Sequence, residues 1–342
     1  MLGLIKMGIT GKELANLLNL SEAAISMALR DKQGVSTQTR KRILEAAEKY
    51  GYDYTKTEKK RKPSRHITFI IYKRQGAIVS ETPFFSALFE GIETACAEFN
   101  YKLQITYIYK DDDMQKKIRE INDSDSAGII LLGTEMQLDD FHVFDTMKLR
   151  IPFILLDVNL DFTQYDSVLI NNVQGAFEAT NYLISKTKKQ PGHLRSSYPI
   201  GNFNKRAEGF YKSVKMHGMS ASKSIVHTLT PSVEGAFVDM MELLEQGEEL
   251  APCYFADNDL IAIGVMRALQ KKGYRIPDDI SIIGFDDLPM ASYIEPSLTT
   301  VHVPVKYMGI TAVKRLNEMI NGDKHSPIKI LVSTRIKKRR SL

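Results

Sequence analysis

Acidic and amide side chains follow three apolar runs of the chain, at the points where those runs end. Carboxylate and amide oxygens are good acceptors for hydroxyl groups, and an arginine supplies a planar set of donors that complements them. Arg206, at the start of a predicted helix, is the best-placed arginine. Residues of these types in one crevice indicate a polyol ligand such as a sugar. The three junctions are Asp157 after 153–156, Asp257, Asn258 and Asp259 after 253–256, and Asp286 and Asp287 after 281–285.

Two aromatic residues could add to such a site. Phe84 and Phe85 lie at the start of a predicted helix and could stack on the apolar face of a sugar ring. A simpler interpretation remains open for several of these residues. One of two adjacent aromatic residues on an amphipathic helix is usually part of the core. Asp259 is also a suitable N-cap for the helix that follows it, and Asp287 could cap a turn.

The elements that would bring these residues together alternate between apolar strands and amphipathic helices. Strands that are apolar almost throughout indicate a parallel sheet covered by helices on both faces. In an open sheet of this kind, ligands bind at the carboxyl ends of the strands, where the polar junctions lie. About ten strands are more than one such sheet usually holds, so we expect two lobes. Predicted strands include 67–72, 103–107, 128–132, 153–156, 168–170, 224–227, 253–256 and 281–285, and predicted helices include 84–100, 176–186, 206–217, 233–246 and 259–273.

The first fifty residues predict three short helices. Thr10 and Glu13 form a capping box, in which the Thr10 hydroxyl accepts from the helix and the Glu13 carboxylate reaches back to the cap. Ser21 is a good N-cap for a second helix, 22–30, and Ser36 for a third. Two short helices joined by a tight turn, with a third to bury them, are the helix-turn-helix design that places one helix in the major groove of DNA. The predicted buried residues are Leu14, Leu17, Leu18, Ile25, Leu29, Ile43, Leu44 and Ala47.

The charge of the chain is divided unevenly, and this supports a DNA-binding head. Residues 1–65 hold 14 Lys and Arg against 7 Asp and Glu, a net charge of +7. The whole chain carries only +5, so the remaining residues sum to −2. A basic head on an acidic body is what phosphate binding by one end of a molecule requires. The alternative, a generic three-helix bundle, would not need this asymmetry.

Composition argues against several other classes of protein. Hydrophobic residues make up 43% of the chain, but no apolar run reaches the length of a membrane span and no secretory signal sequence is recognisable, so we expect a cytoplasmic protein. Cys96 and Cys253 are the only cysteines, with no CxxC motif, which argues against disulfides and structural zinc. The chain lacks a nucleophile elbow, a P-loop and a G-x-G-x-x-G motif. We therefore expect no enzymatic activity, no cofactor and no metal.

The chain resembles the LacI/GalR family of bacterial repressors over nearly its whole length. Segment 9–52 is similar to the DNA-binding module of that family, through Leu20-Ser21, Ile25-Ser26, Val35-Ser36, Thr39-Arg40 and the run 46–52. The body is similar to the regulatory core of the family, through 83–85, 90–93, 151–152, 257–264, 277–287 and 296–301. The resemblance implies an α/β fold: a three-helix helix-turn-helix head, a hinge, and two Rossmann-like parallel-sheet lobes similar to periplasmic sugar-binding proteins, with three crossings of the chain between the lobes.

The resemblance also implies partners and domain limits. The partners would be double-stranded operator DNA with a pseudo-palindromic sequence, bound by a homodimer, and a sugar or sugar phosphate. The residues that would bind this effector are Asp157, Arg206, Asn258 and Asp286, with Phe84 and Phe85 stacking on the ring. The implied domains are a DNA-binding head at 1–53, a basic hinge at 54–66 and an effector-binding core at 67–342, with lobe 1 at about 67–170 and 302–322 and lobe 2 at about 171–301 and 323–336.

The residues expected at the DNA depart from the family pattern. Family members commonly have polar or arginine side chains early on the recognition helix, where this chain has Glu22, Ala23, Ala24 and Met27. The operator should therefore differ from the usual half-site. In the hinge, Arg61 replaces a leucine that inserts into the minor groove. We hypothesise a charged strand that favours an A·T-rich centre, and the alternative is a linker that touches phosphates without preference. The expected DNA-binding residues are Thr10, Ser21, Glu22, Ala23, Ala24, Ser26, Met27, Arg30, Ser36, Thr39, Arg40, Tyr52, Lys59, Lys60 and Arg61.

Together these features predict a sequence-specific DNA-binding regulator, a repressor of carbohydrate-utilisation genes whose operator affinity depends on an effector bound between the lobes. Two alternatives remain open: control by a phosphorylated partner protein, and a sugar-processing enzyme on the same scaffold. The tail 337–342 has no apolar heptads, so we expect a dimer and not a coiled-coil tetramer. Phe203, Tyr72, Lys73 and Arg74 are expected to border the cleft, where they could admit a phosphorylated or acidic ligand.

Overall fold

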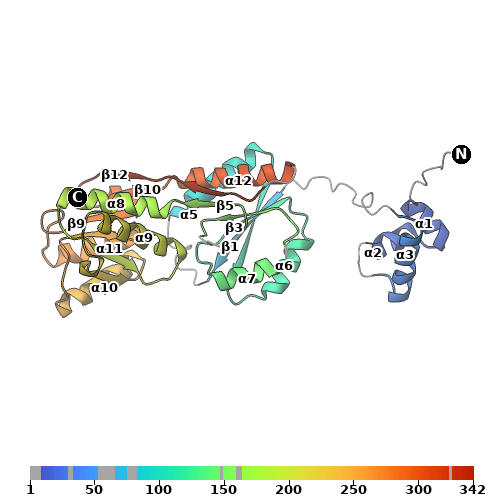
Figure 1. The fold of residues 1–342 in the computed structure, drawn as a ribbon, viewed down its shortest axis with the longest axis horizontal. Coiled ribbons are helices and arrows are strands. Elements are labelled where there is room, and N and C mark those ends of the chain that lie inside the picture. The colour runs from blue at the N-terminus through green and yellow to red at the C-terminus, as the bar shows by residue number, and fades with distance from the viewer. Residues whose placement is uncertain are drawn as a thin grey trace. The chain divides into compact units, whose positions relative to one another are not determined.

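The chain folds into two compact units. The computed structural model describes residues 9–29, 34–52, 66–74, 83–146, 149–158, 164–322 and 326–342. The units are 1–64 and 65–342, which we call the head and the core. The head is helical and the core consists of α/β lobes (Figure 1). Among the described residues, no helix is long and apolar enough to cross a membrane.

The head is built from short helices that begin at predicted hydroxyl residues. They are α1 (Gly11–Leu18), α2 (Glu22–Leu29) and α3 (Thr37–Lys49). The Thr10 hydroxyl accepts from the Glu13 amide at 3.3 Å, and the Glu13 carboxylate accepts from the Thr10 amide at 2.7 Å, which completes the capping box. The hydroxyls of Ser21 and Ser36 each accept from an amide three residues further on. These bonds satisfy amides that have no partner within the helix.

The interior of the head differs in two places from the prediction. Leu17 and Leu44 are 49% and 40% exposed, so the prediction that they are buried is wrong. Alanines fill the interior beside them, because small side chains allow the three helices to approach closely and turn the larger neighbours outward. The buried residues are Leu14, Ala15, Leu18, Ile25, Ala28, Ile43, Ala46, Ala47 and Tyr52.

Each lobe of the core contains one six-stranded sheet within the described residues. The strands of lobe 1 are β1 (His66–Lys73), β2 (Lys102–Tyr109), β3 (Gly128–Leu132), β4 (Phe153–Leu156), β5 (Ser167–Ile170) and β11 (Lys329–Val332). The strands of lobe 2 are β6 (Gly192–Ser196), β7 (Val226–Leu229), β8 (Cys253–Ala256), β9 (Ser281–Asp286), β10 (Thr299–His302) and β12 (Arg335–Lys337). The orders are β11-β5-β4-β3-β1-β2 and β12-β10-β9-β8-β6-β7, and every pair is parallel except β10 with β12.

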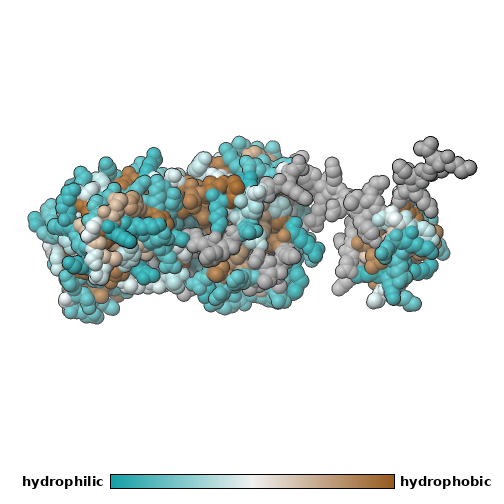
Figure 2. Space-filling view, viewed as in Figure 1, coloured by the Kyte–Doolittle hydropathy of each residue, from teal (hydrophilic) through white to brown (hydrophobic). Residues whose placement is uncertain are grey.

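Helices cover both sheets, as the apolar strands predicted. In lobe 1, β3 is buried along its whole length, and in lobe 2, β8 is. Figure 2 shows polar surface over much of the core and apolar surface gathered near α5 and the start of α12. The helices of the core are α5 (Phe84–Glu98), α6 (Met114–Asp123), α7 (Leu138–Thr146), α8 (Asn172–Thr187), α9 (Gly201–Met216), α10 (Val233–Gln246), α11 (Asp259–Lys271) and α12 (Val305–Asn321), with short 3-10 turns at Ala221–Lys223 and Pro289–Ser292.

The chain crosses between the lobes three times: after β5, after β10 and between β11 and β12. The prediction that 323–336 lies in lobe 2 is wrong for β11, which pairs with β5 in lobe 1. Helix α12 packs on α5 and on the strands of lobe 1. The chain that follows this helix therefore lies beside the edge of the lobe 1 sheet, where β11 pairs with β5. Of the described residues in segment 323–336, those at the start of β12 belong to lobe 2, where β12 runs antiparallel to β10.

Candidate functional site

Side chains from both lobes enclose a small cavity at the carboxyl ends of the central strands. Its volume is about 30 Å³, which is room for one or two water molecules but not for a sugar ring. A sugar ring therefore does not fit this cavity unless its walls move apart. All six residues that the sequence predicted to bind an effector line this cavity. The lining residues are Phe84, Phe85, Thr134, Asp157, Ile170, Ile200, Asn202, Phe203, Arg206, Asn258 and Asp286.

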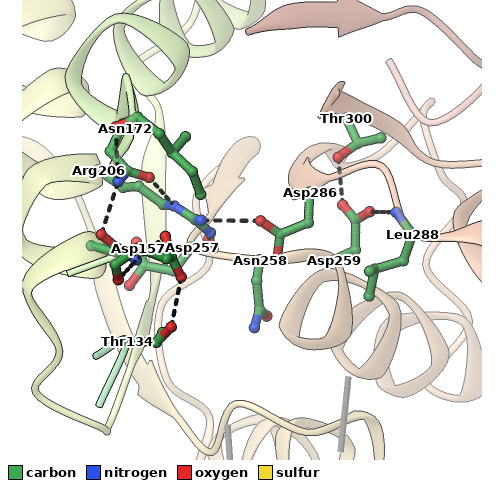
Figure 3. Close-up of polar contacts among 12 residues, drawn as sticks. Thr134, Asp157, Asn172, Arg206, Asp257, Asn258, Asp259, Asp286, Leu288 and Thr300 are labelled. Carbon is green, nitrogen blue, oxygen red and sulfur yellow. Dashed lines mark hydrogen bonds and ion pairs between the residues drawn. The ribbon is translucent and has the colours of Figure 1, made fainter. Parts of the chain in front are cut away.

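Arg206 is the centre of the polar network in the cavity (Figure 3). It lies in the second turn of α9, because the helix begins earlier than predicted. Its Nε donates to Oδ1 of Asn172 over 2.9 Å, its Nη1 donates to the backbone carbonyl of Asp257, and its Nη2 donates to Oδ1 of Asp286 over 3.0 Å. The residue is 3% exposed. These contacts fix the guanidinium and leave two of its five N–H groups for a ligand.

Asp157 is the acidic group that lobe 1 contributes. It follows β4 and accepts from the Thr134 hydroxyl at 2.7 Å and from Nδ2 of Asn202 at 2.9 Å. The amide oxygen of Asn202 in turn accepts from Nδ2 of Asn172 at 3.1 Å, and Asn172 accepts from Arg206. A continuous chain of hydrogen bonds thus runs from lobe 1 into lobe 2, and it depends on the two lobes being close together.

Burial raises the pKa of both carboxyl groups in the cavity. The pKa of Asp157 is raised to about 6, because removal from water outweighs the hydrogen bond from Thr134 and the charge of Arg206. The pKa of Asp286 is also raised to about 6 by burial, although Arg206 opposes the shift. Both groups therefore change protonation state not far below neutral pH, so binding here should depend on pH.

Asn258 presents a donor to the cavity because its oxygen is already used. Its Oδ1 accepts from the Ile261 amide at 2.9 Å as the N-cap of α11, so Nδ2 is the group left for a ligand (Figure 3). Asp259, one residue on, does not line the cavity. It accepts from the Thr300 hydroxyl and from the Leu288 amide and so holds the loop after β9. The interpretation of Asp259 as the N-cap is wrong, because Asn258 caps α11 and Asp259 is the first residue of the helix.

Aromatic rings, together with Ile170 and Ile200, form the apolar part of the lining. The rings of Phe84 and Phe85 meet edge to face with centroids 5.1 Å apart. Phe84 is 7% exposed and belongs to the main apolar core, so it both supports the fold and borders the cavity. Phe203, on α9, is 5% exposed and lines the cavity as expected. The Arg206 guanidinium lies 3.8 Å from the centroid of the Phe285 ring, which fixes it from behind.

Three polar residues of this network were absent from the prediction. Thr134 and Asn172 follow β3 and β5, so applying the strand-end rule to every strand would have found them. Asn202 lies at the start of α9, and its role depends on the packing of one lobe against the other. No pattern in the sequence indicates that.

The other basic residues expected to border the cavity do not line it. Arg74 pairs with Asp140 at 2.6 Å, and its amide donates to the carboxylate of Glu135. The Lys73 ammonium lies over the ring of Tyr107, 4.9 Å from its centroid. Tyr72 is 1% exposed and packs in the interior of lobe 1.

A larger, mostly apolar cavity lies beside the first one. Its volume is about 530 Å³, and it shares Phe84 and Asp286 as walls with the smaller cavity. His302 at the end of β10, the residues that follow it and the start of α12 form much of the rest. Asp287 lies here and not in the smaller cavity, where it pairs with Arg339 at 2.6 Å and with His302 at 2.8 Å.

In the head, most of the predicted DNA-binding residues are accessible. Arg30, Lys59, Lys60 and Arg61 lie outside the described residues. Tyr52 is 8% exposed and its ring packs in the interior of the head, so its side chain supports the fold. The exposed residues are Thr10, Ser21, Glu22, Ala23 and Ser36, and the half-buried ones are Ala24, Ser26, Met27, Thr39 and Arg40.

No cluster of potential metal ligands occurs in the part of the chain that the structure describes. The polar groups that line the small cavity are suited to hydrogen bonding with hydroxyl groups, since they combine carboxylate acceptors, amides and one guanidinium donor.

Comparison with known proteins agrees with this arrangement. Residues 180–342 match the model of a periplasmic binding protein-like domain. The probable HTH-type transcriptional repressor ExuR of Bacillus subtilis is 28% identical over 95% of this chain and 96% of its own length. A complex of the transcriptional regulator CelR with cellobiose has a TM-score of 0.72, with 21% identity over 97% of this chain and 99% of that one. A LacI family transcriptional regulator from Enterococcus faecium with bound ribose has a TM-score of 0.67, with 27% identity over 80% of this chain and 98% of that one.

ExuR and CelR are named as transcriptional regulators, and their similarity to this chain covers the head as well as the core. The capped helices of the head, the two parallel-sheet lobes with three crossings and the cavity between those lobes fit the same assignment. These similarities support the assignment of the chain to the LacI/GalR family of transcriptional regulators.

Proposed function

We propose that this chain is a repressor of carbohydrate-utilisation genes whose affinity for operator DNA is controlled by a sugar bound between the lobes. The observation that carries the proposal is the convergence of Asp157, Arg206, Asn258 and Asp286 on one cavity, in a chain with a helix-turn-helix head. Relatives solved with cellobiose and with ribose support a sugar as the ligand class. The relative named as a repressor supports the sign of regulation.

In this proposal α2 is the recognition helix, because it is the second helix of the helix-turn-helix pair. Glu22 can accept from cytosine N4, and Ala23 and Met27 can pack on a thymine methyl group. Arg40 would contact phosphate and so set register without reading sequence. A homodimer would present two such helices to the halves of a pseudo-palindromic operator.

The hinge residues Lys59, Lys60 and Arg61 lie outside the described residues. We expect this basic segment to favour a narrow, A·T-rich operator centre. Operators that differ only in their central base pairs test the idea. Equal binding to A·T-rich and G·C-rich centres would leave the segment as a linker that touches phosphates.

The sugar would act by changing how the lobes are held. The hydrogen bonds from Thr134 through Asp157 and Asn202 to Arg206 cross from one lobe to the other. A ligand that replaces or extends these bonds favours one lobe arrangement over another, and this changes the spacing of the two heads in a dimer. Thermodynamic linkage then requires operator DNA to change the affinity for sugar by the same factor.

Thermal unfolding of the full-length protein in the presence of mono- and disaccharides tests ligand binding. A sugar at 100 times its dissociation constant should add about 2.7 kcal/mol to the stability of the native state. Arg206→Ala should abolish the shift, because it removes the central donor of the cavity. Arg267→Ala is the matched control, since Arg267 pairs with Glu234 on the surface of lobe 2.

Other results would redirect the proposal. If no sugar shifts the unfolding transition while both variants remain folded, control by a phosphorylated partner protein becomes the better account. If a sugar binds and is chemically converted, the chain is a sugar-processing enzyme, which the regulators among its relatives do not support.

A further inference from the structure

The charges that line the small cavity do not balance. The lining contains the carboxyl groups of Asp157 and Asp286 and one cation, the Arg206 guanidinium. Arg206 is already paired with Asp286 at 3.0 Å and donates to the carbonyl of Asp257. The groups that donate to Asp157 are the uncharged side chains of Thr134 and Asn202. With both acids ionised, the lining carries a net charge of −1.

Basic residues on the elements around the cavity have partners of their own, including Arg339 and His302, which both pair with Asp287. Arg74 pairs with Asp140, and the Lys306 ammonium pairs with Glu90. Lys205, on the same helix as Arg206, lies 3.5 Å from Glu208. No cation in these places is therefore available to balance a negatively charged ligand.

The direction of the hydrogen bonds disfavours a negatively charged ligand, as the charge of the lining does. A carboxylate accepts only, so Asp157 and Asp286 need a ligand that supplies O–H groups. A sugar hydroxyl does this and can also accept from Nδ2 of Asn258 or from the remaining N–H groups of Arg206. An ionised carboxylate or phosphate on the ligand has no proton to donate. Its oxygens would face the carboxylate oxygens of Asp157 or Asp286 with no hydrogen-bond donor between them. Burial makes such a contact more costly than it would be in water.

We propose that the cavity between the lobes selects an uncharged polyhydroxy sugar and rejects the corresponding sugar acid and sugar phosphate. The inference rests on the proposed function and narrows its ligand class. Adjacent hydroxyl groups on one edge of the ring would meet Asp286, Arg206 and Asn258. The apolar face of the ring would lie against the phenylalanines of the lining, Phe84, Phe85 and Phe203.

Matched ligands test the proposal directly. Isothermal titration of the full-length protein would compare ribose with ribose 5-phosphate, and glucose with glucuronate and glucose 6-phosphate. Cellobiose with its aldonic acid gives a third set. For any set with a binding neutral member, we expect the anionic members to bind at least about 100-fold more weakly, since opposing like charges cost several kcal/mol in a desolvated site.

A substitution tests whether the charge of Asp157 causes the selection against anionic sugars. Asp157→Asn removes the unbalanced charge and keeps the size of the side chain, so the difference between neutral and anionic sugars should shrink by about tenfold. Asp111→Asn, at an exposed acid of lobe 1, should leave the difference unchanged. The comparison within the wild-type protein stands by itself if Asp157→Asn does not fold.

Different results would contradict the charge selection and the proposed control by a sugar. An anionic sugar that binds as tightly as its neutral counterpart, or more tightly, would overturn the charge selection while leaving sugar control in place. Absence of binding by every neutral and anionic sugar would overturn the proposed function, and the charge selection with it.

Discussion

The head and the cavity of the core hold their polar groups in opposite ways. In the head, Thr10, Ser21 and Ser36 each bond to an amide three residues further on, so each cap is complete within one turn. In the cavity, the bond from Thr134 to Asp157 spans 23 residues, and that from Arg206 to Asp286 spans 80. The head can therefore be altered one contact at a time, whereas the cavity network should respond as a unit.

The largest expected effect comes from a substitution that unfolds the head and leaves the cavity intact. Leu14 is fully buried among the few apolar residues that hold the three helices together. Leu14→Ala should cost about 2–5 kcal/mol, which is comparable to the whole stability of a domain this small. Binding to DNA should be lost, while titration calorimetry should show unchanged sugar affinity. A parallel loss of sugar affinity would mean that the two units do not fold independently.

A second prediction uses pH to separate the two regions. Asp157 and Asp286 have pKa values raised to about 6, so the folded core binds more protons than the unfolded chain between about pH 4 and 6. Their contribution to stability therefore grows as pH falls through this range, by roughly 1–3 kcal/mol for each group. In the head, hydrogen bonds from Thr10 lower the pKa of Glu13, so the stabilisation of that capping box is lost as pH falls through the lowered value.

Calorimetry of the core transition from pH 7 to pH 4.5 would check the signs. Asp286→Asn should flatten the rise in stability with acid that the wild-type core shows. An identical pH dependence in the wild type and the variant would contradict the assignment of this titration to the cavity.

A third prediction separates the two roles of one residue in the cavity. Asn258 caps α11 with its oxygen and offers Nδ2 to the ligand. Asn258→Ser keeps a good N-cap, so stability should change little, but it removes the donor and should weaken sugar binding about tenfold. Asn258→Ala should lose both. If the serine variant binds sugar like the wild type, Nδ2 does not contact the ligand.

The smallest expected effect concerns a cap in the head. Ser21→Ala should destabilise the head by about 1 kcal/mol, because the Ala24 amide loses its partner. Ser21→Asp should restore the cap but place a negative charge among the residues proposed to face DNA. We expect it to weaken DNA binding without a loss of stability, measured by fluorescence anisotropy and thermal unfolding. Equal DNA binding by both variants would place Ser21 away from the phosphates.

The same contrast explains what the sequence could predict. The capping box at Thr10 and the caps at Ser21 and Ser36 were predictable because their partners lie three residues away. The acids after β4 and β9 were predictable because parallel strands end at a common edge. Asn202 was not, since its contact with Asp157 exists only where the two lobes meet.

Two errors have related physical causes. Leu17 and Leu44 fit the helical period for burial, but three helices of this length cannot enclose every apolar residue they carry, and the alanines beside them take the interior positions. The sheet that β11 joins depends on where helix α12 ends. The short sequence of β11 itself does not encode that position.

The most direct test of the account measures DNA affinity with and without sugar. Operator DNA would be selected from random sequence with the full-length protein, and anisotropy would give its dissociation constant in the absence and presence of a saturating neutral sugar. We expect a change of about tenfold or more, matched by an equal effect of operator DNA on sugar affinity, and no change for Arg206→Ala. A sugar that binds the wild-type cavity yet leaves operator affinity unchanged would contradict the coupling of the two sites.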